Sequence, residues 1–156
     1  MTSYADTSFL VSLYVPEVHS NTAIAAMKQP EGPVLVTALG EVELCHAIEL
    51  RRFRKELTAR QAKCATQAFE QDLQRGIFSL REIPAATFER AKRLARQHTA
   101  LLGTRSLGLI HVASALTLGA TSFFSFDNSR RKLAHQSRLT LVPKTISADK
   151  ARSVAH

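Results

Sequence analysis

Short apolar segments recur along this chain, and stretches with helical spacing separate them. The segments are residues 3–5 (SYA), 34–37 (VLVT), 78–83 (FSLREI), 121–126 (TSFFSF) and 139–142 (LTLV). Strands that alternate with helices favour parallel pairing, and a parallel sheet needs helices over both of its faces. We therefore predict a single α/β domain with a central parallel sheet of four to five strands and helices on both faces.

The length and composition of the chain suit one compact domain. With 156 residues, of which 45% are hydrophobic and 22% charged, it can bury a core without a disulfide or structural metal. We divide it into a domain at residues 1–143 and a basic C-terminal tail at 144–156. Cys45 and Cys64 fall in amphipathic patterns, so we expect reduced thiols in or near the core. With no cationic leader and no apolar run near ~20 residues, we expect a cytoplasmic protein without a membrane partner.

Capping and spacing signals predict where helices begin and which side chains are buried. Thr37 and Asp127 each precede a helical pattern and are predicted N-caps, and Thr58–Gln61 (TARQ) has the pattern of a capping box. The alternation in residues 78–83 places Leu80 in the core. Helical spacing after Pro84 places Phe88 there as well.

The net charge of +8 is unevenly distributed. The chain has 21 basic and 13 acidic residues, but residues 1–50 contain Lys28 as their single basic residue and residues 128–156 contain Asp149 as their single acidic one. A basic surface beside a local acidic cluster fits a protein that attracts a polyanion and holds a cation. The charge alone fits a soluble basic protein equally well.

Three acidic residues lie close to the strand ends at which ligands gather in parallel sheets. Asp6 follows the first strand, Asp127 follows the strand at 121–126, and Glu43 lies in the helix after the strand at 34–37. Taken singly, the two aspartates are explained as N-caps and the glutamate as a solvated helix residue. Taken together, three converging carboxylates repel one another unless a cation is present, and Mg²⁺ or Mn²⁺ prefers such oxygen ligands. We therefore expect a metal site.

Four sequence blocks extend this picture. They are YADTSFLVSLYVPE, VTALGEVELCHAI, RSLGLIHVASALTLGA and FFSFDNSRRKLA, and together they cover nearly the whole chain. In order and spacing they resemble the PIN-domain ribonucleases, above all the VapC-type toxins of prokaryotic toxin–antitoxin pairs. The resemblance implies a PIN-like domain that cuts single-stranded or looped RNA with Mg²⁺ or Mn²⁺. It implies Asp6, Glu43 and Asp127 as catalytic residues and metal ligands, a homodimer, and an antitoxin whose C-terminal segment covers the acidic cleft.

The third block departs from the family at one position. An aspartate usually stands three residues before the histidine of this block, and here that position is Gly108. A helical glycine costs about 1 kcal/mol relative to alanine, so local helix stability does not explain it. Three explanations are open. The lineage has lost catalysis, or a compensating ligand such as water, Ser125 or Asn128 keeps a weakened site, or the glycine is an introduced change from an aspartate codon.

Further residues in these blocks are candidates for orienting ligands or contacting the RNA backbone: Thr7, Ser8, Arg105, Ser125 and Arg130. Each also has a structural explanation as a cap or as part of a solvated helix face. His111 lies one turn from Gly108 on the same helix face. We interpret it as a hydrogen-bonded core histidine rather than a general base.

Two functions from different classes fit these patterns. The first is a metal-dependent endoribonuclease of the VapC-like toxin type, attenuated or inactive because Gly108 replaces an acidic ligand. The second is a catalytically silent PIN domain that binds RNA or an antitoxin and regulates. A plain oligomeric scaffold is the third choice. Metal titration separates the first function from the second, and RNA binding separates the second from the third.

Overall fold

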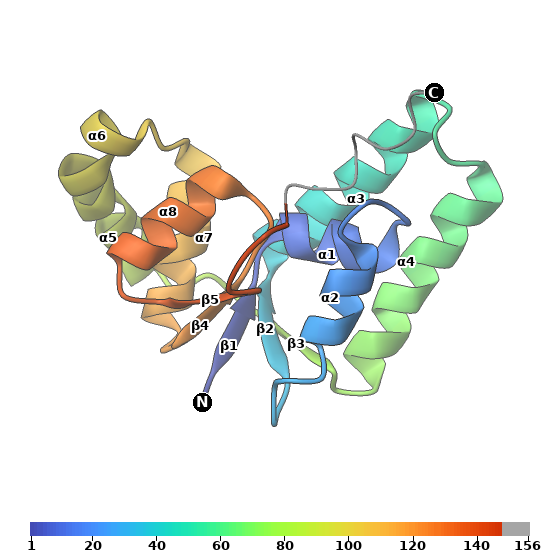
Figure 1. The fold of residues 1–156 in the computed structure, drawn as a ribbon, viewed down its shortest axis with the longest axis horizontal. Helices are drawn as coiled ribbons and strands as arrows, with labels where there is room; N and C mark the ends of the chain where they lie inside the picture. The colour runs from blue at the N-terminus through green and yellow to red at the C-terminus, as the bar shows by residue number, and fades with distance from the viewer. Residues whose placement is uncertain (148–156) are drawn as a thin grey trace.

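Five strands pair in parallel to form the centre of the molecule, seen in a computed structural model that describes residues 1–147 (Figure 1). The strand order is β3-β2-β1-β4-β5. The bounds are Ser3–Ala5 for β1, Val34–Thr37 for β2, Phe78–Arg81 for β3, Ser122–Phe124 for β4 and Thr140–Val142 for β5. The predicted α/β class and parallel sheet are confirmed.

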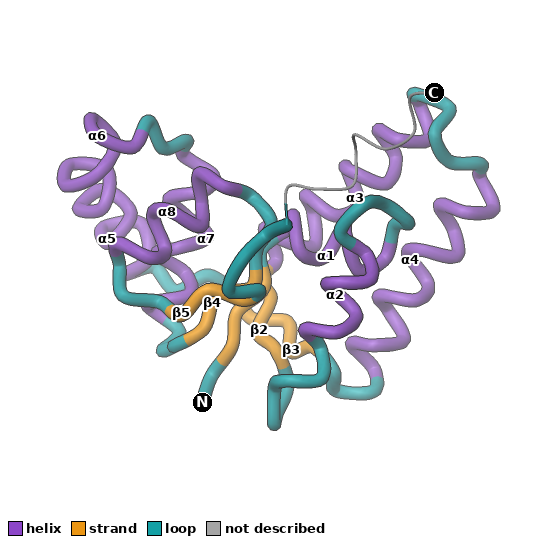
Figure 2. The backbone as a smooth tube through the Cα atoms, in the orientation of Figure 1, coloured by secondary structure: helices purple, strands orange, loops and turns teal. Residues whose placement is uncertain are grey.

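Helices cover both faces of this sheet in two groups that follow chain order (Figures 1 and 2). The first group is α1 (Thr7–Tyr14), α2 (Ser20–Ala26), α3 (Ala38–Phe53) and α4 (Ala59–Gln74). The second group is α5 (Ala86–Leu94), the π-helical turn η1 (Ala95–Thr99), α6 (Ala100–Leu102), α7 (Ser106–Thr117) and α8 (Asn128–Gln136). The sheet thus separates the chain's early helices from its later ones.

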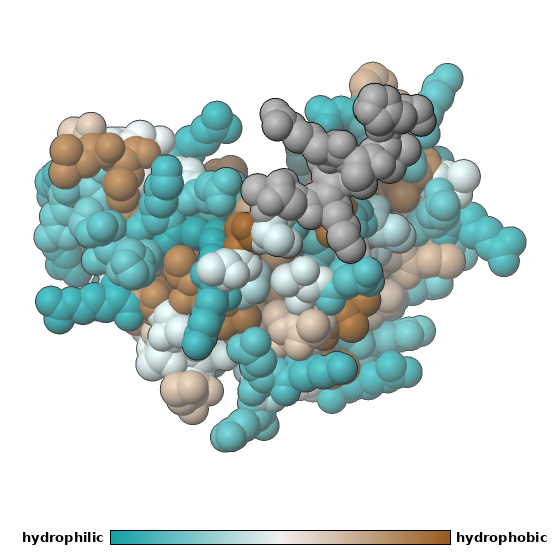
Figure 3. Space-filling view, in the orientation of Figure 1, coloured by the Kyte–Doolittle hydropathy of each residue, from teal (hydrophilic) through white to brown (hydrophobic). Residues whose placement is uncertain are grey.

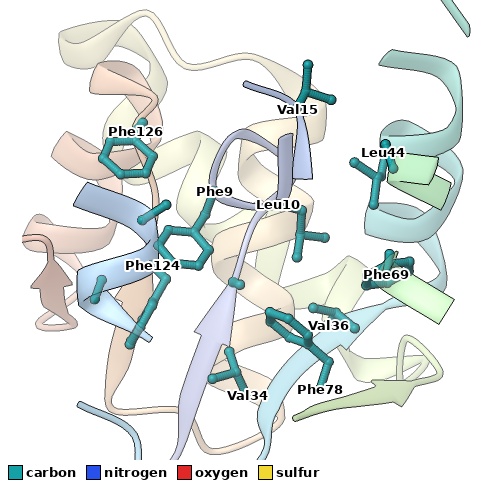
Figure 4. Packing of buried hydrophobic residues seen from close by; sticks show 14 of the residues in the cluster. Phe9, Leu10, Val15, Val34, Val36, Leu44, Phe69, Phe78, Phe124 and Phe126 are labelled. Carbon is teal, nitrogen blue, oxygen red and sulfur yellow. The ribbon is translucent and has the colours of Figure 1, made fainter. Parts of the chain in front are cut away.

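Alternation along the strands divides the core into two clusters, one on each face. Ala5 and Phe124 belong to the cluster that also contains α1–α4 residues, of which Phe9 is seen at its centre in Figure 4. Tyr4 and Phe123 belong to the cluster that contains α5, α7 and α8 residues. Successive strand residues point to opposite faces. The strands are therefore apolar on both sides because each side meets a helix layer.

The predicted caps are present. The Thr37 hydroxyl accepts a hydrogen bond from Gly40 N at 3.4 Å and begins α3. The capping box at Thr58 and Gln61 is complete, since each side chain accepts from the other residue's backbone N–H, at 3.1 and 2.8 Å. Asp127 accepts from Arg130 N at 2.9 Å and begins α8. Short-range chemistry therefore determines where these helices start.

Two predicted core residues are exposed instead. Leu80 is 43% exposed because β3 is an edge strand, and burial is lost along it after Phe78. Phe88 is 52% exposed because α5 buries the stripe that contains Thr87 and Ala91, so Phe88 points away from it. The predictions for Leu80 and Phe88 were therefore wrong, in each case because the local pattern did not show which neighbour covers the element.

The cysteines are free thiols, as predicted, but the prediction that they lie in or near the core was wrong. Cys45 and Cys64 are both exposed. Cys45 follows the buried residue Leu44 of α3 by one position, and Cys64 follows the buried residue Ala62 of α4 by two, so both thiols lie off the apolar stripe of their helix.

No helix within residues 1–147 combines the length and apolar character needed to cross a membrane. The division at residue 143 stays a prediction, and residues 148–156 of the predicted tail lie outside the described part of the chain.

Candidate functional site

Asp6 lies at the junction of β1 and α1, completely buried. Its Oδ1 accepts hydrogen bonds from Phe9 N at 3.1 Å and from Ser8 Oγ at 2.6 Å. Its Oδ2 accepts from Ser125 Oγ, also at 2.6 Å. A buried carboxylate is tolerated only where hydrogen bonds and charge compensate the loss of water. The residue is thus an N-cap, as predicted from its position, and also the centre of a polar cluster.

Ser125 connects this aspartate to the second predicted one. The Ser125 hydroxyl donates to Asp6 and accepts from Asp127 N at 3.1 Å. The Asp127 carboxylate accepts from Arg130 N as the cap of α8. Ser125 and Ser8 therefore touch Asp6 directly, as expected of residues that orient the site, while Asp127 lies next to the cluster at the end of β4.

Glu43 reaches the same region from α3, with a side chain that is 18% exposed. Its Oε1 accepts from Thr7 Oγ1 at 2.7 Å and from His111 Nε2 at 2.5 Å. Burial acts to raise the pKa of Glu43, but the hydrogen bonds from His111 and Thr7, with the charges of His111 and Arg130, outweigh it and lower the pKa to about 2. The carboxylate is consequently ionised at neutral pH and is a weak proton acceptor.

His111 is the hydrogen-bonded buried histidine that its place on an apolar helix indicated. It is 0% exposed, and its Nδ1 lies 2.7 Å from the Tyr4 hydroxyl. In the neutral form of His111, an Nε2–H that donates to Glu43 leaves Nδ1 to accept from Tyr4, whereas in the charged form both ring nitrogens donate. Burial raises the pKa of Tyr4, so its phenol keeps the proton to donate. Tyr4 and His111 together hold Glu43 in one orientation.

Arg130 lies between the two carboxylates. Its Nη1 is 3.5 Å from Asp6 Oδ2, and its Nη2 is 3.6 Å from Glu43 Oε2. The arginine side chain is 16% exposed. One guanidinium therefore neutralises two acidic side chains that come from different strands and helices.

Gly108 faces the stem of this arginine. A Cβ at position 108 would lie 3.2 Å from Arg130 Cγ and 3.6 Å from Arg130 Nε. The distance to Cγ is shorter than side chains normally pack. Gly108 is buried in α7, beside the core residue Leu109. The position at which the family usually has an aspartate is thus covered by Arg130.

The residues as arranged do not fit a divalent metal ion. Mg²⁺ requires near-octahedral oxygen ligands, with some positions open to water or substrate. Here both oxygens of Asp6 accept hydrogen bonds, and the outer oxygens of Asp6 and Glu43 face Arg130. Within residues 1–147 no three Asp, Glu, His or Cys side chains are grouped so as to hold a metal. The ligand roles of Asp6, Glu43 and Asp127 stay predictions.

Ser125 and Asn128, the two residues suggested as ligands in place of an acid at position 108, lie in different environments. The Ser125 hydroxyl is already bonded to Asp6, and Asn128 is exposed at the start of α8. The compensating roles of Ser125 and Asn128 stay predictions. Arg130 was a candidate for RNA contacts, and its position between two acids had no sequence signal. Tyr4 was missed as well, because a tyrosine in a buried strand looks like any other core aromatic.

A cavity of about 750 Å³ lies on the side of Arg130 and Asp127, and neither Asp6 nor Glu43 lines it. It lies between the N-terminal ends of α7 and α8, and its lining includes Arg105, Gly108, Asp127, Asn128 and Arg130. Two helix N-termini and an exposed arginine at position 105 favour an anion such as a phosphate. The site therefore combines a rigid pair of acids with a cavity suited to a negatively charged ligand.

Comparison with known families and structures agrees with this geometry. A family model described as PIN domain matches residues 3–136. The crystal structure of VapC20 from Mycobacterium tuberculosis, a sarcin-ricin loop cleaving toxin, has a TM-score of 0.64 and 17% identity, covering 84% of this chain and 94% of that one. FitAcB from Neisseria gonorrhoeae has a TM-score of 0.62 and 13% identity, covering 90% and 96%. No curated protein sequence matches. At these identities the two structures show a shared fold.

Proposed function

Because this chain belongs to the PIN-domain family, we propose that it is an endoribonuclease of the VapC toxin type in which RNA hydrolysis is strongly attenuated. The observation that carries the proposal is that Asp6 and Glu43 share one partner, Arg130, which also lines a cavity suited to phosphate, while position 108 has no acid. The acids favour a nuclease centre. The arginine and the glycine favour low activity.

RNA is the proposed substrate because the cavity and the overall charge suit a polyanion. Arg105 is exposed just before α7, and residues at the starts of α7 and α8 line the same cavity. Contacts from such residues position a phosphate backbone without reading its sequence. VapC20, which shares the fold, cleaves one particular RNA loop. For this chain we propose only single-stranded or looped RNA as the class of substrate.

A requirement for Mg²⁺ or Mn²⁺ is part of the proposal, since PIN nucleases generally use divalent ions. The present arrangement does not accommodate such an ion, so no step is assigned to it. Glu43, with a pKa of about 2, is a weak base at neutral pH and is suited to accept hydrogen bonds rather than protons. Both oxygens of Asp6 accept hydrogen bonds within the chain, from Ser8 and Ser125. These features support slow hydrolysis.

The proposed setting is a cytoplasmic toxin that forms a homodimer and binds an antitoxin. Exposed apolar side chains at several places on the surface support a protein partner. Phe53 at the end of α3 is 82% exposed and Leu101 in α6 is 86% exposed. Figure 3 shows apolar atoms gathered at the end of the molecule where Figure 1 draws α6. A contiguous exposed apolar patch, unlike a single exposed apolar residue, favours an interface with a partner.

The test is RNA cleavage by the purified chain on a mixture of structured RNAs with Mg²⁺, Mn²⁺ or EDTA. We expect RNA binding in all three, slow cleavage with either metal, and none with EDTA. Asp6→Asn, which keeps the size of the side chain, should abolish the cleavage. A chain that neither binds nor cuts RNA would contradict the proposal.

A second function is favoured by one specific observation. The oxygens of Asp6 and Glu43 all have partners within the chain, as expected of a structural polar cluster. A catalytically silent domain that binds RNA or an antitoxin accounts for this. RNA binding without cleavage at any metal concentration would decide in its favour.

A further inference from the structure

We infer that Arg130 supplies the cation of this carboxylate centre from within the chain, and that Gly108 is the residue that makes room for it. The two residues then form an autoinhibitory pair that weakens the binding of divalent ions at the site. The inference rests on the proposed function, because it explains how such a site is attenuated. It concerns cation binding without RNA and can therefore fail separately.

The first step is the charge of the site. Asp6 is fully buried, and the side chain of Glu43 is 18% exposed. Asp6 Oδ2 and Glu43 Oε2 both face the guanidinium of Arg130. Two carboxylates that share a site repel each other unless a cation lies between them. Arg130 reaches each of them with a different terminal nitrogen, at 3.5 and 3.6 Å. Because a guanidinium is charged at every accessible pH, this compensation is permanent.

The second step is the space that the arginine uses. The α7 backbone at Gly108 cannot retreat, because Leu109 and Val112 on the same helix are packed in the core. A Cβ at position 108 would meet Arg130 Cγ at 3.2 Å, so the arginine stem would have to shift. Glycine at this position thus permits the path of Arg130, whereas an aspartate would both crowd the stem and pair with its charge.

The third step is that neighbouring basic residues have other roles. Arg131 donates to the carbonyl oxygens of Ser125, Pro143 and Lys144 at 2.9, 2.7 and 3.1 Å. Lys132 is exposed on α8. Within residues 1–147, Arg130 is the one Lys or Arg that forms an ion pair with either Asp6 or Glu43. The cation of the site is therefore a single side chain that a mutation can remove.

The inference predicts competition between Arg130 and a divalent ion for the same two carboxylates. Removing the guanidinium leaves the two carboxylates without a compensating charge. Their repulsion should destabilise the fold in EDTA, and their negative charge should favour the binding of a metal ion. An ion that binds only the folded state then raises the unfolding temperature with its concentration. In the native chain Arg130 already compensates the two carboxylates, so a metal ion should raise the unfolding temperature little.

The experiment measures Mn²⁺ binding and thermal unfolding of the full chain without RNA. We expect the native chain to unfold at the same temperature in EDTA and in Mn²⁺. Arg130→Gln should unfold at a lower temperature in EDTA, recover with Mn²⁺, and bind Mn²⁺ at least about tenfold more tightly than the native chain. Lys132→Gln loses the same charge from the same helix at an exposed position, and it should behave like the native chain.

A second variant keeps every charge. Gly108→Ala should displace the Arg130 stem and make the chain respond to Mn²⁺ in part. Gly40→Ala is its control, since it also adds a Cβ to a helical glycine but meets nothing closer than 3.8 Å. This arm decides the matter if Arg130→Gln does not fold. Tight Mn²⁺ binding by the native chain, or an absence of any Mn²⁺ response in both Arg130→Gln and Gly108→Ala, would overturn the inference.

Discussion

The two halves of the site differ in how firmly their residues are held. On the side of β1 and α1, Asp6 is completely buried and accepts three hydrogen bonds of 2.6 to 3.1 Å from Ser8, Phe9 and Ser125. On the side of α7 and α8, Arg130 is partly exposed, its ion pairs are 3.5 and 3.6 Å long, and it rests on a glycine.

This difference predicts that substitutions on the two sides of the site have different effects. Asp6 is part of the core, because the same hydrogen bonds that orient it also cap α1 and link the end of β1 to Ser125, the residue after β4. The cation is an addition at the surface of that core. Changes on the acidic side should therefore alter folding first, and changes on the basic side should alter ligand binding and activity first.

The largest effect is expected from Asp6→Ala. The substitution leaves the hydroxyls of Ser8 and Ser125, the N–H of Phe9 and the guanidinium of Arg130 without their acceptor. We expect a loss of about 3 kcal/mol or more in the free energy of unfolding. Urea unfolding measures it, with Asp127→Ala as the comparison, since loss of that partly exposed cap should cost only about 1 kcal/mol. Equal losses for the two variants would break the contrast between the halves.

Glu43 should make the fold sensitive to acid. Its folded pKa of about 2 lies below the ordinary value of 4.5, so its stabilisation is fully present above about pH 5 and is lost as the pH falls toward 2. The shift corresponds to at most roughly 3 kcal/mol over that range, and solvent screening of this half-buried carboxylate reduces it. Urea unfolding from pH 6 to pH 2 should show this loss in the native chain and a smaller one in Glu43→Gln.

Glu89→Gln provides the control for this pH dependence. The pKa of Glu89 is also lowered, by its hydrogen bond with Lys92, but this glutamate is exposed and solvent screens the pair. Its removal should leave the acid unfolding profile nearly unchanged. If Glu89→Gln and Glu43→Gln alter the profile alike, the buried network around His111 does not stabilise the charge of Glu43.

Restoring the acid of the third block tests the basic half. Gly108→Asp should keep the fold within about 1 kcal/mol, because an anion near a helix N-terminus is favoured and glycine is a poor helix former. Alone, the new carboxylate should pair with Arg130 and raise RNA cleavage modestly. Combined with Arg130→Gln, it should raise cleavage by about tenfold to a hundredfold, or roughly 1.4 to 2.7 kcal/mol in activation free energy.

Cleavage assays with Mn²⁺ and EDTA on the single and double variants measure this difference. Asp6→Asn in the double variant is the blank. A double variant that folds but cuts no faster than the native chain would show that position 108 has no part in catalysis.

The smallest effect is expected from Arg105→Gln. This exposed arginine at the mouth of the cavity should contribute one phosphate contact, so its loss should weaken RNA binding a few-fold and lower the salt dependence by about one ion. RNA titrations at several salt concentrations measure both. Arg93→Gln, on the exposed face of α5 and outside the cavity lining, should change neither. Equal effects of the two substitutions would mean that the cavity is not where RNA binds.

The sequence by itself determined the helices, the strands and the strand ends at which the acids lie. Thr37, Asp6 and Asp127 could be recognised as caps because capping depends on hydrogen bonds within three residues. The apolar segments predicted a parallel sheet because each strand is apolar on both faces. Asp6 and Glu43 could be predicted to approach each other, since parallel strands end at the same edge of a sheet.

Only the tertiary structure decided how the charges of these acids are balanced. Arg130 and Gly108 meet because α7 and α8 pack against one face of the sheet, and Tyr4 meets His111 across a sequence separation of 107 residues. Nothing local to residue 130 distinguishes it from Arg131, whose guanidinium instead binds carbonyl oxygens near Pro143. The path of a long, flexible side chain depends on the space that distant residues leave for it, and here that space comes from the missing side chain at Gly108.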